Sequence, residues 1–180
     1  MRVITGTARG RQLRTAPGEH TRPTTARVKE AIFSIIQFDI EGRRVLDLFA
    51  GTGQMGIEAL SRGAGEVVFV DNSAEALSIL RANLEHTGLS GGTIKACDAI
   101  AYLHRSQDPF DIVFLDPPYQ SKLLLQALQT IESIDILRPG GIIICETGND
   151  SVPPALSDPY VLDRTYRYGT QMVWLYRRQS

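Results

Sequence analysis

Two aspartates flank the most glycine-rich stretch of the chain. Asp47 stands just before the segment 48–56, Leu-Phe-Ala-Gly-Thr-Gly-Gln-Met-Gly, and Asp71 lies twenty residues after Gly51. The spacing Gly-x-Gly-x-x-Gly lets a backbone approach a ligand closely, and a carboxylate after the next strand can accept hydrogen bonds from ribose hydroxyls. The pattern predicts a site for a ligand that carries a ribose.

Asp47 discriminates between two ligands of that kind. A pyrophosphate is bound by backbone amides at a helix N-terminus, with no competing anion nearby. A carboxylate just before the loop would repel phosphate, but it suits the ammonium group of a methionine moiety. The sequence therefore favours S-adenosylmethionine (SAM) over a nicotinamide dinucleotide. The structural alternative is that Asp47 only caps or supports the loop.

Asp98 lies at the end of another expected strand, in Lys95-Ala96-Cys97-Asp98-Ala99. Ligands of doubly wound sheets bind at the carboxyl ends of the strands. We expect Asp98 to accept a hydrogen bond from the adenine amino group. It is also placed to be the N-cap of a helix that starts at Ala99, and one side chain can fill both roles.

The sequence Asp116-Pro117-Pro118-Tyr119 supplies a second kind of chemistry. Two prolines remove two amide donors, and each restricts the residue before it to an extended conformation. The result is a stiff turn that presents a carboxylate and carbonyls as hydrogen-bond acceptors, which suits an exocyclic -NH₂ group. Tyr119 can stack on a base that has left its own stack. We expect methyl transfer to a base amine, with catalysis by positioning and electrostatics.

These groups need a scaffold of alternating strands and helices. Short apolar segments bounded by turn residues predict strands at 45–49, 66–70, 93–97, 111–115 and 141–146. Helices are expected after the glycine loop to about Ser61, from Ser73 (the N-cap) to about His86, between strands three and four, and from Lys122 to about Ile134. The fold class is therefore α/β, with a doubly wound, mostly parallel sheet. Segments 161–168 and 171–177 predict a C-terminal antiparallel hairpin, which completes seven strands and distinguishes a class I methyltransferase from a plain dinucleotide-binding fold.

The first 36 residues form a separate, basic extension in this prediction, and residues 37–180 form the methyltransferase domain. Segments 2–5 and 11–15 suggest a small hairpin, and a helix is expected from Ala26 to about Ile36. Residues 1–44 contain nine Lys/Arg against four Asp/Glu, whereas residues 45–180 contain ten against sixteen. A basic segment joined to an acidic body suggests a polyanionic partner. A solvated charged segment is the alternative.

Other features exclude several classes of protein. No apolar segment is as long as the ~18 residues of a membrane span, and the first residues carry no signal-peptide pattern. Cys97 and Cys145 are expected as reduced thiols, and the three histidines show no spacing typical of metal ligands. We therefore expect a cytoplasmic protein, a monomer, with no metal and no membrane partner.

Taken together, these motifs resemble those of a known family. Arg9-Gly10-Arg11, residues 21–33 (TRPTTARVKEAIF), 46–53 (LDLFAGTG), 58–64 (EALSRGA) and Tyr168-Gly169 look like the RsmD family, the bacterial 16S ribosomal RNA guanine-N2 methyltransferases. The resemblance covers essentially the whole chain. It implies SAM-dependent methylation of the N2 amine of guanine 966 in 16S ribosomal RNA of an assembling small subunit. The residues alone equally permit adenine N6 on DNA or RNA.

Three sets of candidate residues follow. The predicted catalytic residues are Asp116, Pro117, Pro118 and Tyr119. The predicted SAM-binding residues are Asp47, Phe49, Ala50, Gly51, Gly53, Asp71, Asn72, Asp98 and Ala99. The predicted RNA-binding residues are Arg9, Arg11, Arg14, Arg22, Thr24 and Arg27. The competing classes are a DNA adenine methyltransferase, a nicotinamide-dependent oxidoreductase and a non-catalytic RNA-binding factor that retains SAM.

Overall fold

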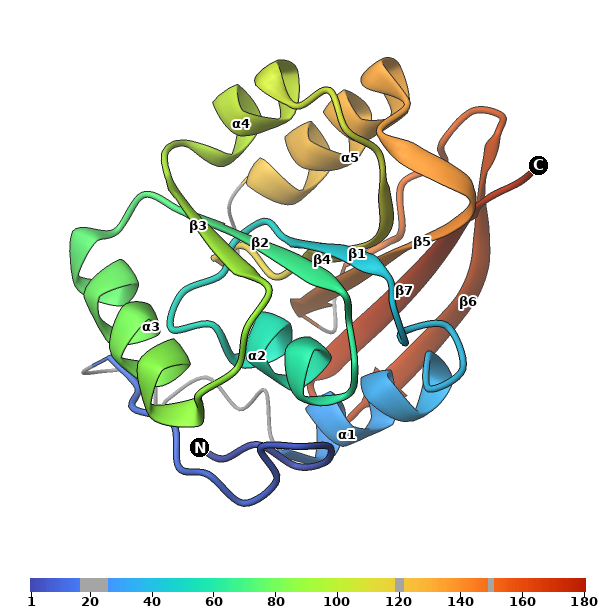
Figure 1. Ribbon diagram of the computed structural model, residues 1–180. Coiled ribbons are helices and arrows are strands. Elements are labelled where there is room, and N and C mark those ends of the chain that lie inside the picture. Colours follow the sequence, from blue (N-terminus) through green and yellow to red (C-terminus); the bar gives the residue numbers. More distant parts are fainter. Residues whose placement is uncertain (17–25, 119–121, 149–150) are drawn as a thin grey trace.

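The computed structural model describes residues 1–16, 26–118, 122–148 and 151–180. Seven strands form one sheet in the order β3-β2-β1-β4-β5-β7-β6 (Figure 1). The five parallel strands are β1 (Arg44–Asp47), β2 (Glu66–Asp71), β3 (Gly92–Ala96), β4 (Phe110–Leu115) and β5 (Leu137–Gly148). β6 (Tyr160–Tyr168) and β7 (Gln171–Arg178) form the antiparallel hairpin, with β7 between β5 and β6. The predicted fold class is confirmed.

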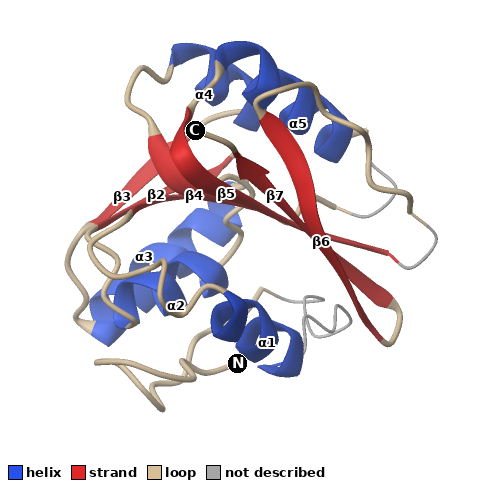
Figure 2. Ribbon diagram, turned by 90° about the vertical axis from the view of Figure 1, so that its right-hand side faces the viewer, coloured by secondary structure: helices blue, strands red, loops and turns tan. Residues whose placement is uncertain are grey.

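Five helices cover the two faces of the sheet (Figure 2). α1 (Ala26–Ile35), α2 (Gln54–Ser61) and α3 (Ala74–Thr87) lie on one face, and α4 (Ala99–Arg105) and α5 (Leu123–Ile134) lie on the other. Ser73 caps α3 as predicted, because its side chain accepts a hydrogen bond from the amide of Ala76. No helix within the described ranges is both long and apolar enough to span a bilayer.

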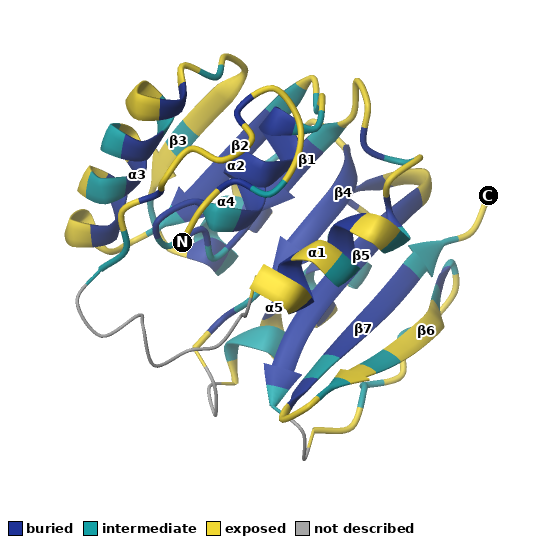
Figure 3. Ribbon diagram, turned by 90° about the horizontal axis from the view of Figure 1, so that it is seen from below, coloured by how far each residue is buried: buried dark blue, intermediate teal, exposed yellow. Residues whose placement is uncertain are grey.

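The sheet separates two hydrophobic clusters. Val45, Ile112, Phe114, Ile144 and Val173 point to the α1–α3 face. Their neighbours along the strands point to the α4–α5 face, among them Leu46, Val113, Leu115, Cys145 and Trp174. This alternation is the period of two that side chains follow along a strand. The inner strands are buried, whereas the outer strands β3 and β6 are largely exposed (Figure 3).

β5 starts four residues earlier than the sequence predicted. Leu137 already pairs with Phe110, and the register with β4 shifts before Ile142 pairs with Ile112. Pro139, Gly140 and Gly141 lie in this stretch, and Gly140 has a positive φ of 78°. The sequence predicted a later start of the strand, because proline and glycine ordinarily mark turns.

The N-terminal residues pack into the same core as the α1–α3 face. Val3, Ala8 and Leu13 are buried in the cluster that contains Phe33 and Ile57. The predicted hairpin is reduced to one antiparallel bridge, between Arg2 and Gln12. Packing therefore continues across the predicted boundary at residue 36, and a separate role for residues 1–36 stays a prediction.

Candidate active site

A cavity of about 100 Å³ opens at the carboxyl ends of β1 and β4. It is lined by Asp47, by the glycine loop that follows β1 and by Asp116. Asp47 pairs with Phe114 in the sheet, and Asp116 follows two residues later, directly after the end of β4. Because Val45 and Phe114 both point to the α1–α3 face, alternation brings Asp47 and Asp116 to that face as well. Two carboxylates that are far apart in the sequence thus share one site.

Asp47 is 4% exposed, and its carboxylate bonds the first turn of α2. Its Oδ2 accepts a hydrogen bond of 2.9 Å from the amide of Gly56. Gly56 is the third residue of α2, whose N-cap is Gly53, a residue without a side chain to bond that turn. Asp47 therefore caps α2 from the strand. Asp47 thus has the supporting role that the sequence left open. This role does not exclude contact with a ligand, because Asp47 also lines the cavity.

Burial raises the pKa of Asp47 to about 7, with smaller contributions of the same sign from Asp116 and Asp71; the Gly56 amide opposes the shift. Two carboxylates, Asp47 and Asp116, line the cavity, and the charge of Lys29, which also lines it, is balanced by Glu58. Such a cavity stabilises a bound cation more than a bound anion. Its electrostatics fit a ligand with positive charge, and they disfavour a pyrophosphate.

Two glycines of the loop serve packing inside the protein. A Cβ at Gly53 would lie 2.1 Å from Leu80 of α3, and a Cβ at Gly56 would lie 2.2 Å from the ring of Phe69 on β2. Gly53 also has a positive φ of 86°. Close packing of α2 against β2 and α3 therefore requires glycine at both positions. The close approach of this loop to a ligand, expected from the sequence, stays a prediction.

Asp71 ends β2 and holds the loop. Its Oδ2 accepts from the amide of Gly51 at 2.8 Å, and its Oδ1 accepts from the amide of Ser73 at 2.8 Å. Each carboxylate oxygen has a second lone pair, so both can accept further hydrogen bonds. The following residue, Asn72, is exposed. Asp71 thus fixes the glycine loop and the start of α3 together, and its predicted contact with ribose stays a prediction.

Asp98 takes its capping role in the structure. Its Oδ1 accepts a hydrogen bond of 2.9 Å from the amide of Ala101, at the start of α4. Asp98 lines a second hollow beside α4 and α5, with Ile100 and Leu123, and not the cavity that contains Asp47. The two predicted SAM contacts Asp47 and Asp98 therefore lie on different hollows of the same sheet edge.

The turn after β4 separates two cavities. Asp116 lines the cavity with Asp47, whereas Pro117 and Pro118 line another of about 280 Å³. The second cavity also includes Glu146 and Trp174, which the sequence argument did not single out. The remaining member of the predicted catalytic set, Tyr119, lies outside the described residues.

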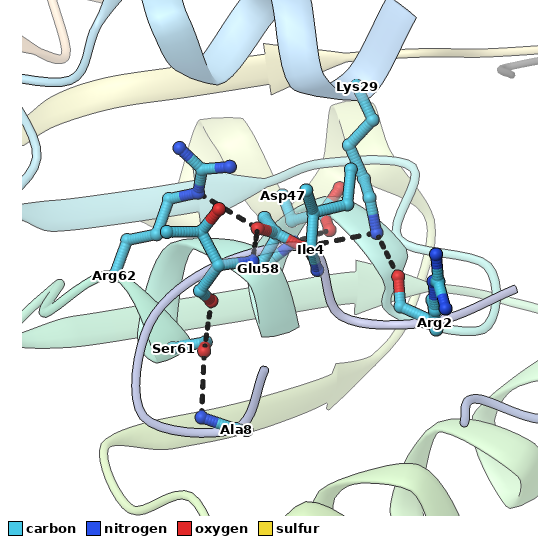
Figure 4. A network of polar contacts seen from close by, with 10 residues as sticks. Arg2, Ile4, Ala8, Lys29, Asp47, Glu58, Ser61 and Arg62 are labelled. Carbon is cyan, nitrogen blue, oxygen red and sulfur yellow. Dashed lines mark hydrogen bonds and ion pairs between the residues drawn. The ribbon is translucent and has the colours of Figure 1, made fainter. Parts of the chain in front are cut away.

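Glu58 of α2 joins the N-terminal segment to the site (Figure 4). Its side chain is fully buried and accepts from the amides of Ile4 and Thr5 at 2.8 and 3.0 Å. It also forms ion pairs with Lys29 of α1 at 3.2 Å and with Arg62 at 2.8 Å. The ammonium of Lys29 donates a further hydrogen bond to the carbonyl of Arg2 at 3.0 Å.

Lys29 is one of the nine basic residues counted in residues 1–44, but the structure buries it. Its side chain is 0% exposed and lines the Asp47 cavity. Burial lowers the pKa of Lys29, and Glu58 opposes that shift. Its position on the apolar face of α1 next to Val28 was the available signal. The partner, Glu58, lies too far along the sequence to be identified from spacing.

Asn83 of α3 fixes the segment at a second point. Its Oδ1 accepts from the amide of Arg14 at 2.8 Å, and its Nδ2 donates to the carbonyls of Arg14 and Thr52, each at 3.0 Å. Thr52 belongs to the glycine loop, so the backbone of Arg14 is held beside that loop. The side chains of Arg9, Arg11, Arg14 and Arg27 are exposed. Arg22 and Thr24 lie outside the described residues.

Comparisons with known proteins place the chain among methyltransferases. The family model described as "Conserved hypothetical protein 95" matches residues 1–177. The chain is 38% identical over 184 residues to "Putative rRNA methyltransferase YlbH" of Bacillus subtilis, covering 100% of both chains. It is 30% identical over 180 residues to "Ribosomal RNA small subunit methyltransferase D" of Escherichia coli, covering 100% of this chain and 91% of that protein.

A solved structure of a similar protein superposes on almost the whole of this chain. It is titled "Putative methyltransferase yhhF from Escherichia coli" and superposes with a TM-score of 0.90 at 31% identity. The match covers 99% of this chain and 98% of that one. The similarity therefore includes the N-terminal segment and the β6–β7 hairpin as well as the central sheet.

Proposed function

Since the chain belongs to the RsmD family of methyltransferases, we propose that it transfers a methyl group from SAM to the N2 amine of a guanine in 16S ribosomal RNA. The family resemblance suggests guanine 966, on the small subunit or its assembly intermediate. We place this reaction in the cytoplasm, where ribosomal subunits assemble, and expect the chain to act as a monomer. The relatives' names support ribosomal RNA as substrate.

One observation carries the proposal: Asp47 and Asp116 share a cavity with the glycine loop. The first carboxylate suits a cationic cofactor, and the second belongs to a proline-stiffened turn that suits an amine. Transfer of a methyl group requires the cofactor and the target amine to lie within contact distance of each other. Neighbouring strands β1 and β4 bring the two groups to one sheet edge.

The residues around the cavity fit SAM, a ligand with both an ammonium and a sulfonium charge. In this proposal Asp47 binds the ammonium of SAM. The other contacts come from the glycine loop next to it, at Phe49, Ala50, Gly51 and Gly53. Asp71 and Asn72 contact the ribose, and Asp98 and Ala99 the adenine. When bound, SAM supplies an electrophilic methyl group, whose bond to sulfur breaks, with its electron pair staying on sulfur, as a bond from nitrogen forms.

Asp116 acts on the target amine. Its carboxylate and the carbonyls of the turn accept hydrogen bonds from the -NH₂ group, which directs the nitrogen lone pair toward the methyl group. Pro117 and Pro118 have no amide hydrogens that could compete for these acceptors. Once the nitrogen is methylated it carries an extra proton, which Asp116 can accept and release to water. Stacking of Tyr119 on the base is part of the same proposal.

The basic extension supplies the attraction for RNA. Arg9, Arg11, Arg14 and Arg27 are exposed, and the backbone of Arg14 is held beside the glycine loop through Asn83. Guanidinium groups pair with phosphates through two parallel hydrogen bonds. We propose that these arginines, with Arg22 and Thr24, guide the RNA to the site.

Labelled methyl transfer tests the function directly. Small-subunit RNA and assembly particles from cells lacking the enzyme are incubated with the protein and labelled SAM, and the modified nucleosides are identified by mass spectrometry. We expect N2-methylguanosine from the wild type and a rate near zero from Asp116→Ala, with SAM affinity changed by less than a few-fold.

A matched control uses Asp111, a buried carboxylate at the start of the strand that Asp116 follows. Asp111 lies at the opposite end of β4 and bonds the amide of Arg44 and the side chain of Arg138, both at 2.8 Å. Asp111→Asn should retain methyl transfer in whatever fraction folds. Detection of N6-methyladenosine in place of N2-methylguanosine would establish the adenine alternative, and SAM binding without transfer to any RNA would favour the non-catalytic factor.

A further inference from the structure

Two tyrosines of the C-terminal hairpin lie side by side on the face of the sheet that carries Asp47 and Asp116. The ring centroids of Tyr166 and Tyr168 are 6.3 Å apart, and the ring planes differ by 18°. Both rings are half-buried and pack against the same hydrophobic cluster as Val173, on the α1–α3 face. Because β6 is an edge strand and largely exposed (Figure 3), the outer part of each ring reaches the surface.

The register of the sheet places Tyr166 level with the Asp116 turn. Leu115, directly before Asp116, pairs with Cys145 on β5. Val173 on β7 pairs with the next residue of β5 on one side and with Tyr166 on the other. From β4 the sheet continues through β5 and β7 to β6, and these three strand spacings amount to about 14 Å. On the order of four stacked nucleotides span this distance.

The end of the chain is basic, although the rest of the methyltransferase domain is acidic. Residues 164–180 contain four arginines and no acidic residue, whereas residues 45–163 contain six Lys/Arg against sixteen Asp/Glu. Two of the four arginines form ion pairs within the protein. The other two, Arg164 and Arg167, are exposed and form no ion pair within the described ranges. Their charge is available to a polyanion.

Alternation along β6 separates these two arginines. Arg164 lies on the side of the tyrosines, since its Nη1 donates to the hydroxyl of Tyr166 at 3.3 Å. Arg167 lies between the two tyrosines in sequence and pairs with Met172, whose side chain packs against the cluster of the opposite face. Aromatic rings beside a guanidinium suit a single-stranded nucleic acid, because bases of any kind stack on the rings and phosphates pair with the guanidinium.

We infer that Tyr166 and Tyr168 form a stacking platform for one or two unpaired bases of the substrate RNA, within about four nucleotides of the methylated base, and that Arg164 pairs with a phosphate beside them. The inference rests on the proposed function and deepens it, because it assigns part of RNA recognition to the hairpin, in addition to the N-terminal extension. It also gives a role to the Tyr168-Gly169 motif, which the proposed reaction does not use.

Abasic nucleotides in the substrate test the stacking. The substrate is the form that the wild type methylates, free RNA or a reconstituted particle, and the methylated position is mapped first. RNAs with a single abasic nucleotide at each of the four positions on either side of it are then compared for binding to the protein. Wild-type affinity should fall about fivefold or more at one or two of these positions, as expected for a base that stacks on an aromatic ring.

Paired variants separate stacking from other effects of the hairpin. Tyr166→Leu/Tyr168→Leu should bind intact RNA about as weakly as the wild type binds the abasic RNA, and the abasic nucleotide should weaken its binding no further. Tyr166→Phe/Tyr168→Phe keeps both rings and should show the wild-type pattern. Arg164→Ala should flatten the salt dependence of binding by about 0.7, whereas Arg167→Ala, on the opposite face, should leave it unchanged. All four variants should keep wild-type SAM affinity.

The effect of an abasic nucleotide compares two RNAs on the same protein, so it does not depend on the folded fraction. A smaller loss than fivefold at every position in the wild type would overturn the inference, as would an equal loss in the wild type and the double leucine variant. If the double leucine variant fails to bind SAM, Tyr168→Leu alone should lose the effect at one position. Absence of methylation of any RNA by the wild type would instead overturn the proposed function.

Discussion

Removal of Glu58 should destabilise the protein through the charge that it leaves behind. Glu58→Leu removes the carboxylate that accepts hydrogen bonds from the amides of Ile4 and Thr5. The buried ammonium of Lys29 then keeps its hydrogen bond to the carbonyl of Arg2 but loses its ion pair with Glu58. Breaking a buried pair by removing one partner costs about 3–5 kcal/mol. Such a loss is a large fraction of the ~5–15 kcal/mol that stabilises an ordinary domain.

An upper limit on this cost comes from Lys29 itself. The ammonium can lose its proton in the folded variant, which at pH 7 costs roughly 4–5 kcal/mol for a lysine with an ordinary pKa of about 10.4. The unfolded chain then binds one more proton than the folded variant. Stability therefore rises with pH, by about 1.4 kcal/mol per unit between pH 7 and about 10.

Urea unfolding of Glu58→Leu and the wild type at pH 7, 8 and 9 measures both quantities. Lys29→Met should cost less, since Glu58 keeps Arg62 and two backbone amides. The double variant Lys29→Met/Glu58→Leu should recover part of the loss and show no such pH dependence. Glu66→Leu is the matched control: it removes the pair between Arg44 and the half-exposed Glu66, which can reach water, and should cost about 1 kcal/mol.

A difference between Glu58→Leu and the wild type that does not change with pH would refute this reasoning. It would mean that Lys29 stays charged in the variant. The ammonium would then have another stabilising environment, and the cavity that it shares with Asp47 would be the place to look for it.

Three further predictions concern ligands. Burial raises the pKa of Asp47 to about 7, so the contribution of Asp47 lowers the stability of the free protein as the pH rises from about 4 to 7. A cationic cofactor binds the ionised form of Asp47, so calorimetry should find that SAM affinity rises about twentyfold from pH 5.5 to 7.5. Asp47→Asn should remove this dependence of SAM affinity on pH. Asp71→Ala should weaken SAM binding about tenfold to a hundredfold, through a ribose contact and release of the Gly51 amide; unchanged affinity in a folded variant would contradict the assignment. Replacing Arg9, Arg11 and Arg14 together should lower RNA affinity and flatten its salt dependence by about 0.7–0.9 per lost phosphate contact, with SAM binding intact; the wild-type slope in the triple variant would mean that RNA binds elsewhere.

The sheet and its carboxylates could be predicted because their signals are local. Strands β1, β2 and β4 each end where an apolar segment meets an aspartate, and parallel strands bring such ends to one edge. Asp47, Asp71 and Asp116 are at those ends in the structure. The capping roles of Asp47 and Asp98 were foreseen as alternatives, since capping depends on residues that are close in sequence.

Features that depend on distant partners could not be predicted. Lysine is ordinarily a surface residue, and the burial of Lys29 depends on Glu58, a residue of another helix. Gly53 and Gly56 fitted a ligand-binding pattern, and the atoms that explain them belong to Leu80 and Phe69. Glu146 was interpreted only as the end of a strand, because its pairing with Gln171 spans 25 residues of sequence and depends on the hairpin.

The attachment of the N-terminal segment also sets an order in time. Ile4 and Thr5 need Glu58, and Arg14 needs Asn83, which lies 69 residues further along the chain. At a synthesis rate of about 5–20 residues per second, Arg14 leaves the ribosome several seconds before its partner exists. Until then Val3 and Leu13 have no core to enter. The residues made first are thus among the last that can dock, and substitutions in α3 should delay their burial during translation.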